Sequence, residues 1–183
     1  MRQVYFVRHS LRDFTIREDR EVPLTVEGMK LAKELKPFFV NKDISRIYSS
    51  PYLRAVQTIE PLAELLNIDI ILVEELRERT VGDWVENFSE FSNSQWKDFD
   101  YKLENGESLN QVRQRIVSVY EKILKQEESN IIISGHGTSL AILFNAILDG
   151  DFGFEDFHKM KMPDIYCGVY SNNQLITFEH VLD

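Results

Sequence analysis

Cysteine is almost absent from this chain, which contains Cys167 and no other thiol. One cysteine cannot form an internal disulfide, and it cannot build a cysteine-based metal cluster. Long hydrophobic runs are also missing, because no stretch approaches the roughly 18 apolar residues that a membrane helix requires. Basic residues are outnumbered, with 21 Lys and Arg against 30 Asp and Glu, which gives a formal net charge of -9. This excess of acidic residues argues against nonspecific binding to nucleic acid, which requires a basic surface.

The rest of the composition is ordinary for a globular protein, with 43% hydrophobic and 28% charged residues. A length of 183 residues allows a sizeable core and predicts a single domain over residues 1–183. The first predicted strand begins almost at Met1, and no signal-peptide cleavage site follows it. The sequence therefore favours a cytoplasmic location.

Short apolar runs alternate with segments of helical periodicity. Thr25 and the capping-box pattern of Ser108 and Gln111 predict helix starts, and Ser50 followed by Pro51 predicts another. Residues 82–107 are acidic and aromatic, which predicts a helical insertion because so many aromatic side chains need burial. The predicted strands are 4–7, 46–49, 68–73, 130–134, 166–170 and 175–181. Apart from the insertion, the predicted helices are 26–40, 51–66, 108–126 and 138–148. This alternation indicates an α/β sandwich built on a mostly parallel sheet.

Three of the predicted strand ends carry residues suited to an anion. The first strand runs into Arg8 and His9, Arg54 follows the second strand at a helix start, and His136 lies between two glycines after the fourth strand. Such strand ends meet at one edge of a parallel sheet, where helix starts offer N–H groups to an anion. Each feature alone is commonly structural: a polar strand end, a helix-surface arginine or a histidine in a turn. Their coincidence predicts a phosphate pocket inside an acidic protein.

The segments VRHS, IYSSPYLRAVQT, LRERTVGDW, ENGESLNQVRQR and IIISGHGTS occur in the order seen in the histidine phosphatase superfamily, the phosphoglycerate mutase-like proteins. The chain resembles that family over about residues 4–140. The resemblance implies a three-layer α/β/α sandwich around a mostly parallel mixed sheet. It also implies that His9 is phosphorylated during turnover, that Glu78 is the general acid and base, and that phosphate is bound by Arg8, Arg54 and His136.

Physical chemistry is consistent with these implied roles. Arginine presents a permanently charged fork of donors to phosphoryl oxygens, where lysine would offer only a point charge. His9 must be neutral at the attacking nitrogen, and we expect a backbone carbonyl to hold its other nitrogen. Attack on phosphorus would give a phosphohistidine that water then cleaves. Glu74 and Glu75 lie near Glu78 in the sequence, and the position within the motif favours Glu78.

The sequence departs from the family pattern just after His9. Ser10 replaces the usual glycine, which is tolerable if the backbone there has a negative φ. Arg12 replaces a threonine or serine, and two interpretations remain open. Arg12 is either a third cation for a second acidic group of the substrate or a solvent-exposed residue paired with Asp13 or Glu18; we favour the exposed position. Trp84 is expected in the core or in the pocket wall, and His158 and His180 are expected to be structural or exposed.

The favoured function is a metal-independent phosphomonoesterase that acts on a small phosphorylated metabolite and needs no cofactor. A phosphoglycerate mutase is the first alternative, disfavoured because Lys97 and Lys102 are the only cations in residues 82–107. A catalytically silent phosphate-binding module is the second, although such a module would have no use for Glu78. A metal site on His9 and His136 is disfavoured by the adjacent arginines. We expect no nucleic-acid or membrane partner, and the sequence leaves the substrate and oligomeric state open.

Overall fold

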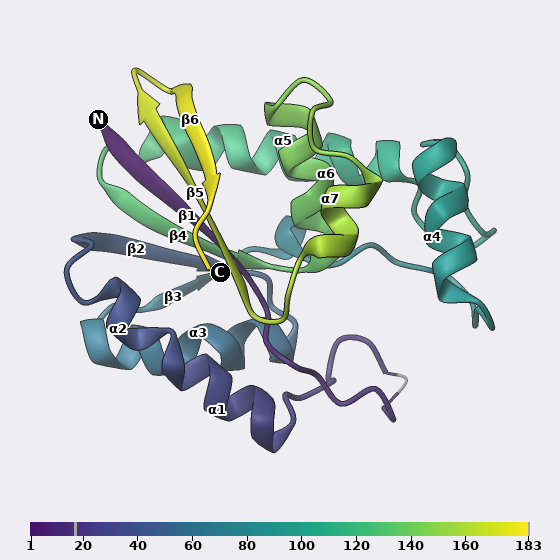
Figure 1. Cartoon of the computed structure of the whole chain (residues 1–183), viewed down its shortest axis with the longest axis horizontal. Coiled ribbons are helices and arrows are strands. Elements are labelled where there is room, and N and C mark those ends of the chain that lie inside the picture. Colours follow the sequence, from purple (N-terminus) through teal and green to yellow (C-terminus); the bar gives the residue numbers. More distant parts are fainter. Residues whose placement is uncertain (17, 183) are drawn as a thin grey trace.

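A six-stranded mixed sheet forms the centre of the computed structural model, which describes residues 1–16 and 18–182 (Figure 1). The strands follow the order β3-β2-β4-β1-β5-β6 across the sheet. Strands β3, β2, β4 and β1 pair in parallel, whereas β5 is antiparallel to both β1 and β6. Their bounds are β1 Arg2–Arg8, β2 Ile44–Ser49, β3 Ile70–Leu72, β4 Asn130–Gly135, β5 Asp164–Ser171 and β6 Gln174–His180.

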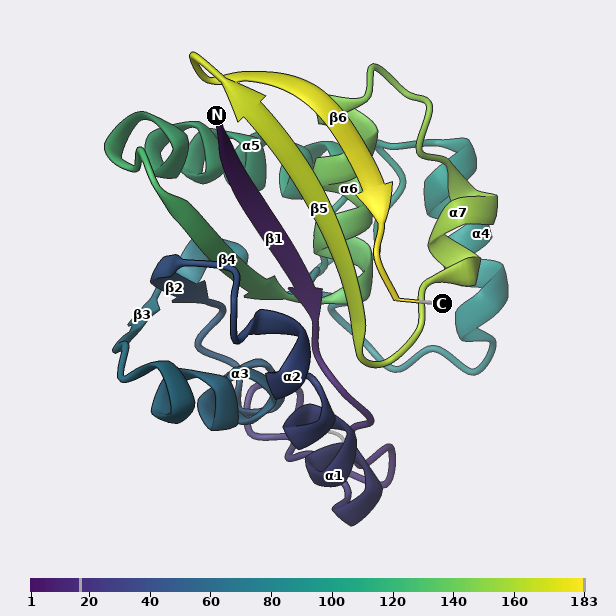
Figure 2. The same cartoon turned by 60° about the vertical axis from the view of Figure 1, so that its left-hand side comes forward.

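Helices cover both faces of the sheet, as Figures 1 and 2 show. One layer contains α1 (Val26–Glu34), α2 (Lys36–Phe39) and α3 (Leu53–Leu66), and the other contains α5 (Leu109–Gln126), α6 (Gly137–Ile147) and α7 (Phe154–Lys159). A hydrophobic core lies between the sheet and each helix layer, and side chains of β1 contribute to both. Tyr5 and Val7 pack with the first layer, while Val4 and Phe6 pack with the second. The predicted α/β/α sandwich around a mostly parallel sheet is therefore confirmed.

Several local signals act as the sequence predicts. The Thr25 side chain accepts a hydrogen bond from the Gly28 N–H at 3.0 Å and caps α1. Ser108 and Gln111 form the reciprocal capping box of α5. The turn between β5 and β6 places Asn172 and Asn173 at φ values of 48° and 64°, the left-handed region that asparagine tolerates.

Two predicted helices are wrong in their boundaries, and one helix was not predicted. The helix expected over residues 26–40 is divided into α1 and α2, and α2 carries a proline in its first turn, where the ring prevents continuation of the preceding helix. The helix α3 begins at Leu53, because the Ser50 hydroxyl accepts a bond from the Tyr52 N–H and also contacts His136. The short helix α7 lies in a segment for which the sequence predicted no helix.

Residues 82–107 contain the helix α4 (Phe88–Lys97), which lies at the opposite end of the molecule from the N-terminus (Figure 1). Trp96 of α4 stacks on Phe157 of α7 with ring centres 5.8 Å apart, so the predicted burial of aromatic side chains is partly realised there. A single-turn 3-10 helix, η1 (Glu74–Leu76), precedes this segment. The interpretation of residues 82–107 as an insertion into one domain stays a prediction.

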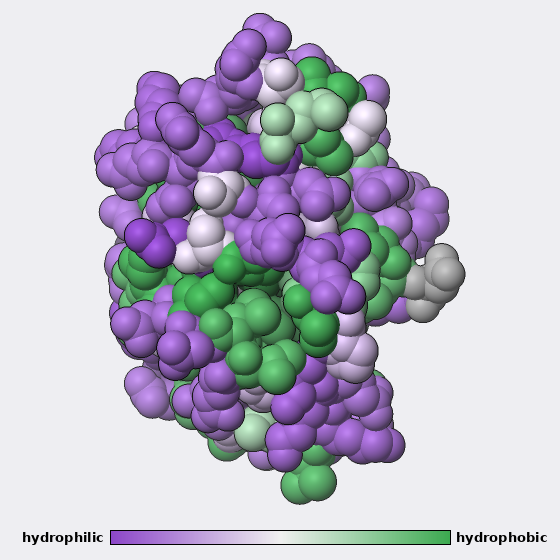
Figure 3. All heavy atoms as spheres, turned by 90° about the vertical axis from the view of Figure 1, so that its left-hand side faces the viewer, coloured by the Kyte–Doolittle hydropathy of each residue, from purple (hydrophilic) through white to green (hydrophobic). Residues whose placement is uncertain are grey.

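The surface at which the parallel strands begin is largely hydrophilic, with several hydrophobic areas, the largest of them near its centre (Figure 3). The cavity described below opens elsewhere, where these strands end. None of the helices in the described part of the chain is long and apolar enough to cross a membrane.

Candidate active site

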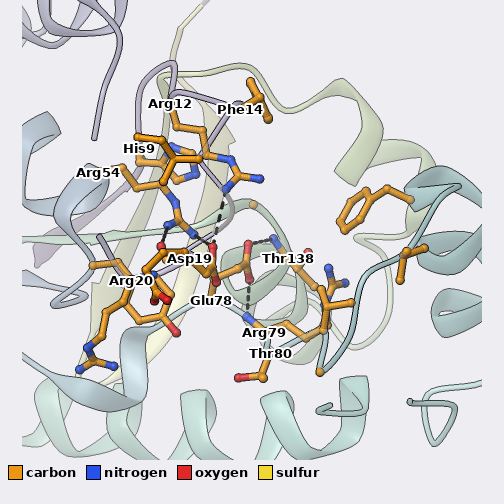
Figure 4. A pocket seen from close by; sticks show the side chains of 18 of the residues that line it. His9, Arg12, Phe14, Asp19, Arg20, Arg54, Glu78, Arg79, Thr80 and Thr138 are labelled. Carbon is orange, nitrogen blue, oxygen red and sulfur yellow. Dashed lines mark hydrogen bonds and ion pairs between the residues drawn. The ribbon is translucent and has the colours of Figure 1, made fainter. Parts of the chain in front are cut away.

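A cavity of about 720 Å³ opens where β1 and β4 end. Arg8 and His9 enter its wall from the end of β1, and Gly137 and Thr138 enter from the start of α6. Arg54 in the first turn of α3 and Glu78 after η1 also line it. Figure 4 shows His9, Arg12, Arg54, Asp19 and Glu78 lying together. The structure thus brings four of the five predicted site residues to one cavity wall, and the fifth, His136, lies directly behind.

The tautomer of His9 is determined by the backbone. Its Nδ1 lies 2.7 Å from the carbonyl oxygen of Ser10, and a carbonyl can only accept, so Nδ1 carries the proton. The other ring nitrogen, Nε2, is then left with a lone pair. Burial, together with the positive charges of Arg54 and Arg8, holds the pKa of His9 well below 6.5. His9 is therefore a neutral imidazole, oriented by its own backbone, beside two guanidinium groups.

The neutral state of His9 should persist into mildly acidic solution. Because its folded-state pKa is lowered, the ring gains a proton only when the pH falls below that lowered value, so no titration is expected between about pH 8 and pH 6. NMR of the ring carbons measures this directly, with the spectrum of His9→Ala providing the assignment. Arg54→Met should raise the pKa of His9 because it removes the positive charge that lowers this pKa most. A wild-type transition at the ordinary value near 6.5 would contradict the assigned environment.

His136 lies against His9, with ring centres 5.3 Å apart, and it is fully buried. Its Nε2 is 2.7 Å from the hydroxyl of Ser50, the residue that follows β2. Its Nδ1 is buried and has no hydrogen-bond partner among the described residues. Burial and the Arg54 charge lower the pKa of His136 well below 6.5. The Ser50 contact thus holds a neutral ring whose second nitrogen has no hydrogen-bond partner among the described residues.

The two predicted phosphate-binding arginines differ in how they are held. Arg8 donates from Nη1 to the carbonyl of Met160 at 2.8 Å, and its guanidinium packs directly over Gly137, where a Cβ would lie 2.8 Å from Nη2. Glycine at 137 is therefore required for Arg8 to keep this position. Arg54 is 2% exposed and forms an ion pair with Asp19, with Nη2 and Oδ1 3.0 Å apart. A carboxylate of the protein thus occupies part of the positive cluster.

Glu78, which follows η1 in the sequence, has its carboxylate against the first turn of α6. Its carboxylate accepts backbone N–H bonds from Thr138 at 3.0 Å, Ser139 at 2.9 Å and Arg79 at 2.7 Å. This position places the carboxylate against the favourable end of the helix dipole and within the cavity wall. Of the other two acidic residues considered from the sequence, Glu74 pairs with Arg20 at the surface and Glu75 is exposed.

The helix starts offer fewer free N–H groups than the sequence suggested. In α6, the N–H groups of Thr138 and Ser139 are occupied by Glu78. In α3, the N–H of Leu53 donates to the carbonyl oxygen of Arg20. The capacity of the cavity to bind an anion therefore depends mainly on arginine side chains and on the two histidines.

The residues that depart from the family pattern have definite positions. Ser10 is outside the set of described non-glycine residues with positive φ, and its hydroxyl donates to the carbonyl of Gly28. The favoured interpretation of Arg12 was wrong, because Arg12 lines the cavity, stacks 4.7 Å above Phe14 and lies 3.6 Å from Asp19. The loop after β1 folds back over the site, and this brings Arg12 inward.

The outer wall of the cavity is apolar and partly aromatic. Phe14, Trp84 and Phe88 line it and are 66%, 64% and 50% exposed, respectively. Phe157 of α7 and Met162 complete this part of the wall. Exposed aromatic side chains collected around one cavity are typical of a binding surface. The inner end of the cavity is therefore suited to an anionic group, and the outer end is suited to an apolar group.

Sequence reasoning missed three polar residues of the site. Asp19 and Ser50 were overlooked because their relevance depends on contacts made across the fold with Arg54 and His136. Arg79 lines the cavity and was hidden within the same motif as Glu78. Ser50 comes directly after β2, and this position at a strand end was the one feature of the sequence that could have identified it as a site residue.

Similar proteins of known sequence cover nearly the whole chain. A Hydrogenobacter thermophilus protein named "Putative phosphoserine phosphatase 2" is 28% identical over 177 residues, which are 90% of this chain and 86% of that protein. A Proteus mirabilis protein named "Probable phosphoglycerate mutase" is 27% identical over 162 residues, which are 81% of this chain and 75% of that protein.

Solved structures share the fold. A mycobacterial glucosyl-3-phosphoglycerate phosphatase in complex with inorganic phosphate has a TM-score of 0.80 at 18% identity, over 100% of this chain and 96% of that chain. The family model described as "Histidine phosphatase superfamily (branch 1)" matches residues 4–172. This chain therefore belongs to branch 1 of the histidine phosphatase superfamily.

Proposed function

We propose that this protein is a metal-independent phosphomonoesterase that hydrolyses a small phosphorylated metabolite through a phosphohistidine intermediate. The observation that carries the proposal is the state of His9: its Nδ1 is held by the Ser10 carbonyl, its pKa is lowered, and it lies beside Arg8 and Arg54 in the cavity wall. A neutral imidazole among permanent cations is prepared to attack an anionic electrophile. A residue that only bound phosphate would not need to remain neutral.

In the first step, the Nε2 lone pair of His9 attacks phosphorus, and the bond between phosphorus and the ester oxygen breaks. Arg8 and Arg54 stabilise the charge on the peripheral phosphoryl oxygens, and His136 Nδ1 adds a further hydrogen bond. Glu78 in its acid form gives a proton to the departing alkoxide. The alcohol leaves, and the phosphoryl group remains on His9.

In the second step, water attacks phosphorus while Glu78 takes a proton from that water. The bond between phosphorus and Nε2 breaks, which releases inorganic phosphate and restores neutral His9. Asp19 forms an ion pair with Arg54, so the phosphoryl group must compete with this carboxylate for the guanidinium.

The named activities of relatives support a phosphorylated small molecule as substrate. One relative is named for phosphoserine, and one structural neighbour is a phosphatase of glucosyl-3-phosphoglycerate. The apolar outer wall of the cavity, with Phe14 and Phe88, would hold the carbon part of such a substrate. The same pocket has room for several substrates of this chemical class.

The test is release of inorganic phosphate from p-nitrophenyl phosphate and from a panel of phosphate esters, with and without EDTA. We expect hydrolysis that is unchanged by the chelator, because the proposed nucleophile and phosphate ligands are side chains. Loss of activity in EDTA would refute the metal-independent mechanism. Conversion of 3-phosphoglycerate to 2-phosphoglycerate would instead identify a mutase. Binding of inorganic phosphate without release from any ester would identify a binding module.

A further inference from the structure

Asp164 is a fully buried carboxylate that the proposed mechanism does not use. It begins β5 and lies directly opposite Arg8 in the antiparallel pair of β5 and β1. Side chains of directly opposed residues project from the same face of a sheet, with Cβ atoms about 5 Å apart. Burial lowers the pKa of Arg8, and the charges of Glu78 and Asp164 oppose that shift. The carboxylate therefore lies beside a cation that the mechanism assigns to the phosphoryl group.

Three donors fix the carboxylate of Asp164. Its Oδ1 accepts from the Ile165 N–H at 3.0 Å and lies 2.6 Å from His180 Nε2, and its Oδ2 accepts from the Lys161 N–H at 2.9 Å. An ionised carboxylate only accepts hydrogen bonds, so His180 supplies the proton from Nε2. Both oxygens are thus engaged, which holds the carboxylate in one orientation.

The contact with Lys161 connects Asp164 to the segment that holds Arg8. Met160 precedes Lys161, and its carbonyl oxygen accepts a hydrogen bond from Arg8 Nη1 at 2.8 Å. Asp164 closes the turn that begins at this carbonyl. The guanidinium of Arg8 also packs over Gly137. Arg8 is therefore held between the start of α6 and a turn that Asp164 closes.

His180 connects this turn to the last strand of the sheet. It lies opposite Tyr166 in the pair of β6 and β5, and the two rings stack with their centres 4.7 Å apart. Strands β1, β5 and β6 lie side by side, as Figure 2 shows. The side chain of His180 is 39% exposed, whereas that of Asp164 is buried. His180 thus lies between the solvent and the buried carboxylate.

Arg54 is the appropriate comparison within the cavity. Asp19 pairs directly with its guanidinium, with Nη2 and Oδ1 3.0 Å apart. Within residues 1–16 and 18–182, no carboxylate lies within ion-pair distance of Arg8. A carboxylate bonded directly to Arg8 would compete with the phosphoryl group. Asp164 instead acts on Arg8 through the turn and across the strand pair.

We propose, on the basis of the proposed phosphomonoesterase function, that Asp164 and His180 are positioning residues for Arg8. Asp164 closes the turn that carries the Met160 carbonyl and places a fixed negative charge near the guanidinium. His180 holds the Asp164 carboxylate in its orientation. The fork of Arg8 is thereby oriented before the substrate binds, which favours charge-assisted hydrogen bonds to the phosphoryl oxygens.

The test is a double-mutant cycle between Asp164 and Arg8, measured as kcat/KM for p-nitrophenyl phosphate and as Kd for inorganic phosphate. Asp164→Asn nearly keeps the shape of the side chain, removes its charge and turns an NH₂ group toward a donor. We expect kcat/KM to fall and Kd to rise, each about 10-fold. In the Arg8→Met background the same substitution should change both by less than about 2-fold, because the residue through which it acts is absent.

Arg54→Met provides the matched background. Asp19 holds Arg54, so Asp164→Asn should keep its full effect there. An equal factor in the Arg8→Met and Arg54→Met backgrounds would indicate a general loss of structure and would overturn the inference. The absence of any effect in the otherwise wild-type protein would also overturn it. Asp151→Asn removes a carboxylate charge at an exposed position before α7 and should change neither quantity.

Variants of His180 test the same inference without altering the buried carboxylate, so they decide it even where Asp164→Asn does not fold. His180→Leu removes the donor and should lower kcat/KM by about 3- to 10-fold. His180→Gln, whose amide nitrogen can donate in place of Nε2, should recover most of that loss. An equal loss in both variants would assign His180 a packing role and overturn its part in the inference.

Failure of the proposed function would give a different result. A wild-type protein that hydrolyses no ester, p-nitrophenyl phosphate included, would refute the phosphomonoesterase. The Kd values for inorganic phosphate would still complete the cycle. Coupling between Asp164 and Arg8 in those values would support the positioning role, and additivity would overturn it.

Discussion

Replacing His9 with alanine should slow phosphomonoester hydrolysis by about 10,000-fold or more, because removal of a nucleophile eliminates the covalent route. Binding of inorganic phosphate should survive, since Arg8, Arg54 and His136 all remain. Steady-state hydrolysis of p-nitrophenyl phosphate measures the first effect, and calorimetric titration with phosphate measures the second. His158→Ala, which removes an exposed histidine on α7, should leave the rate near that of the wild type.

Rapid quenching of the wild-type protein should also capture the intermediate. When the substrate carries a labelled phosphoryl group, mass spectrometry of the quenched protein should locate the label in the peptide that contains His9. The covalent mechanism requires both the loss of activity in His9→Ala and the labelled His9 peptide in the wild type. Full hydrolytic activity in His9→Ala, or rapid turnover without a labelled peptide, would exclude the covalent mechanism.

Replacing Glu78 with glutamine should have a large effect that depends on the leaving group. An alkyl phosphate requires protonation of a strongly basic alkoxide, so its hydrolysis should fall by about 100- to 10,000-fold. The p-nitrophenolate ion is weakly basic and needs much less protonation, so formation of the phosphohistidine from its ester should be far less affected. Single-turnover kinetics with both esters separate this step from the later hydrolysis.

Glu78 also has a structural role that the same experiment must distinguish. Its carboxylate accepts N–H bonds from Thr138, Ser139 and Arg79, and a glutamine side chain would turn its NH₂ group toward at least one of these donors. If the substitution acts only by disturbing α6, phosphohistidine formation from both esters should slow by the same factor. An equal loss for both would therefore contradict the acid role, and Glu75→Gln at an exposed position serves as the control.

The sequence predicted the fold well where local patterns coincide with tertiary structure. The apolar run of residues 130–134 was predicted as a strand, and it forms β4, which lies between β1 and β2. The caps at Thr25 and Ser108 form as expected, because each depends only on residues three positions away. The coincidence of three strand ends also predicted one pocket for Arg8, His9, Arg54 and His136; the first three line the cavity, and His136 lies behind it against His9.

The remaining features depend on contacts that no local pattern encodes. The loop after β1 returns over the cavity because Leu11 bonds to Thr25 and Arg20 bonds to Leu53, and this return directs Arg12 inward. The pairing of Asp19 with Arg54 joins positions 35 residues apart. A loop of mixed charges permits many pairings, and the choice among them is made by tertiary structure.

The hydrogen bond between His9 Nδ1 and the Ser10 carbonyl has a regiochemical consequence. A nitrogen that is protonated and engaged with the backbone has no lone pair to give to phosphorus. In the proposed mechanism only the isomer substituted on Nε2 can form, and the isomer substituted on Nδ1 is excluded. One peptide carbonyl thereby selects between two otherwise plausible covalent products.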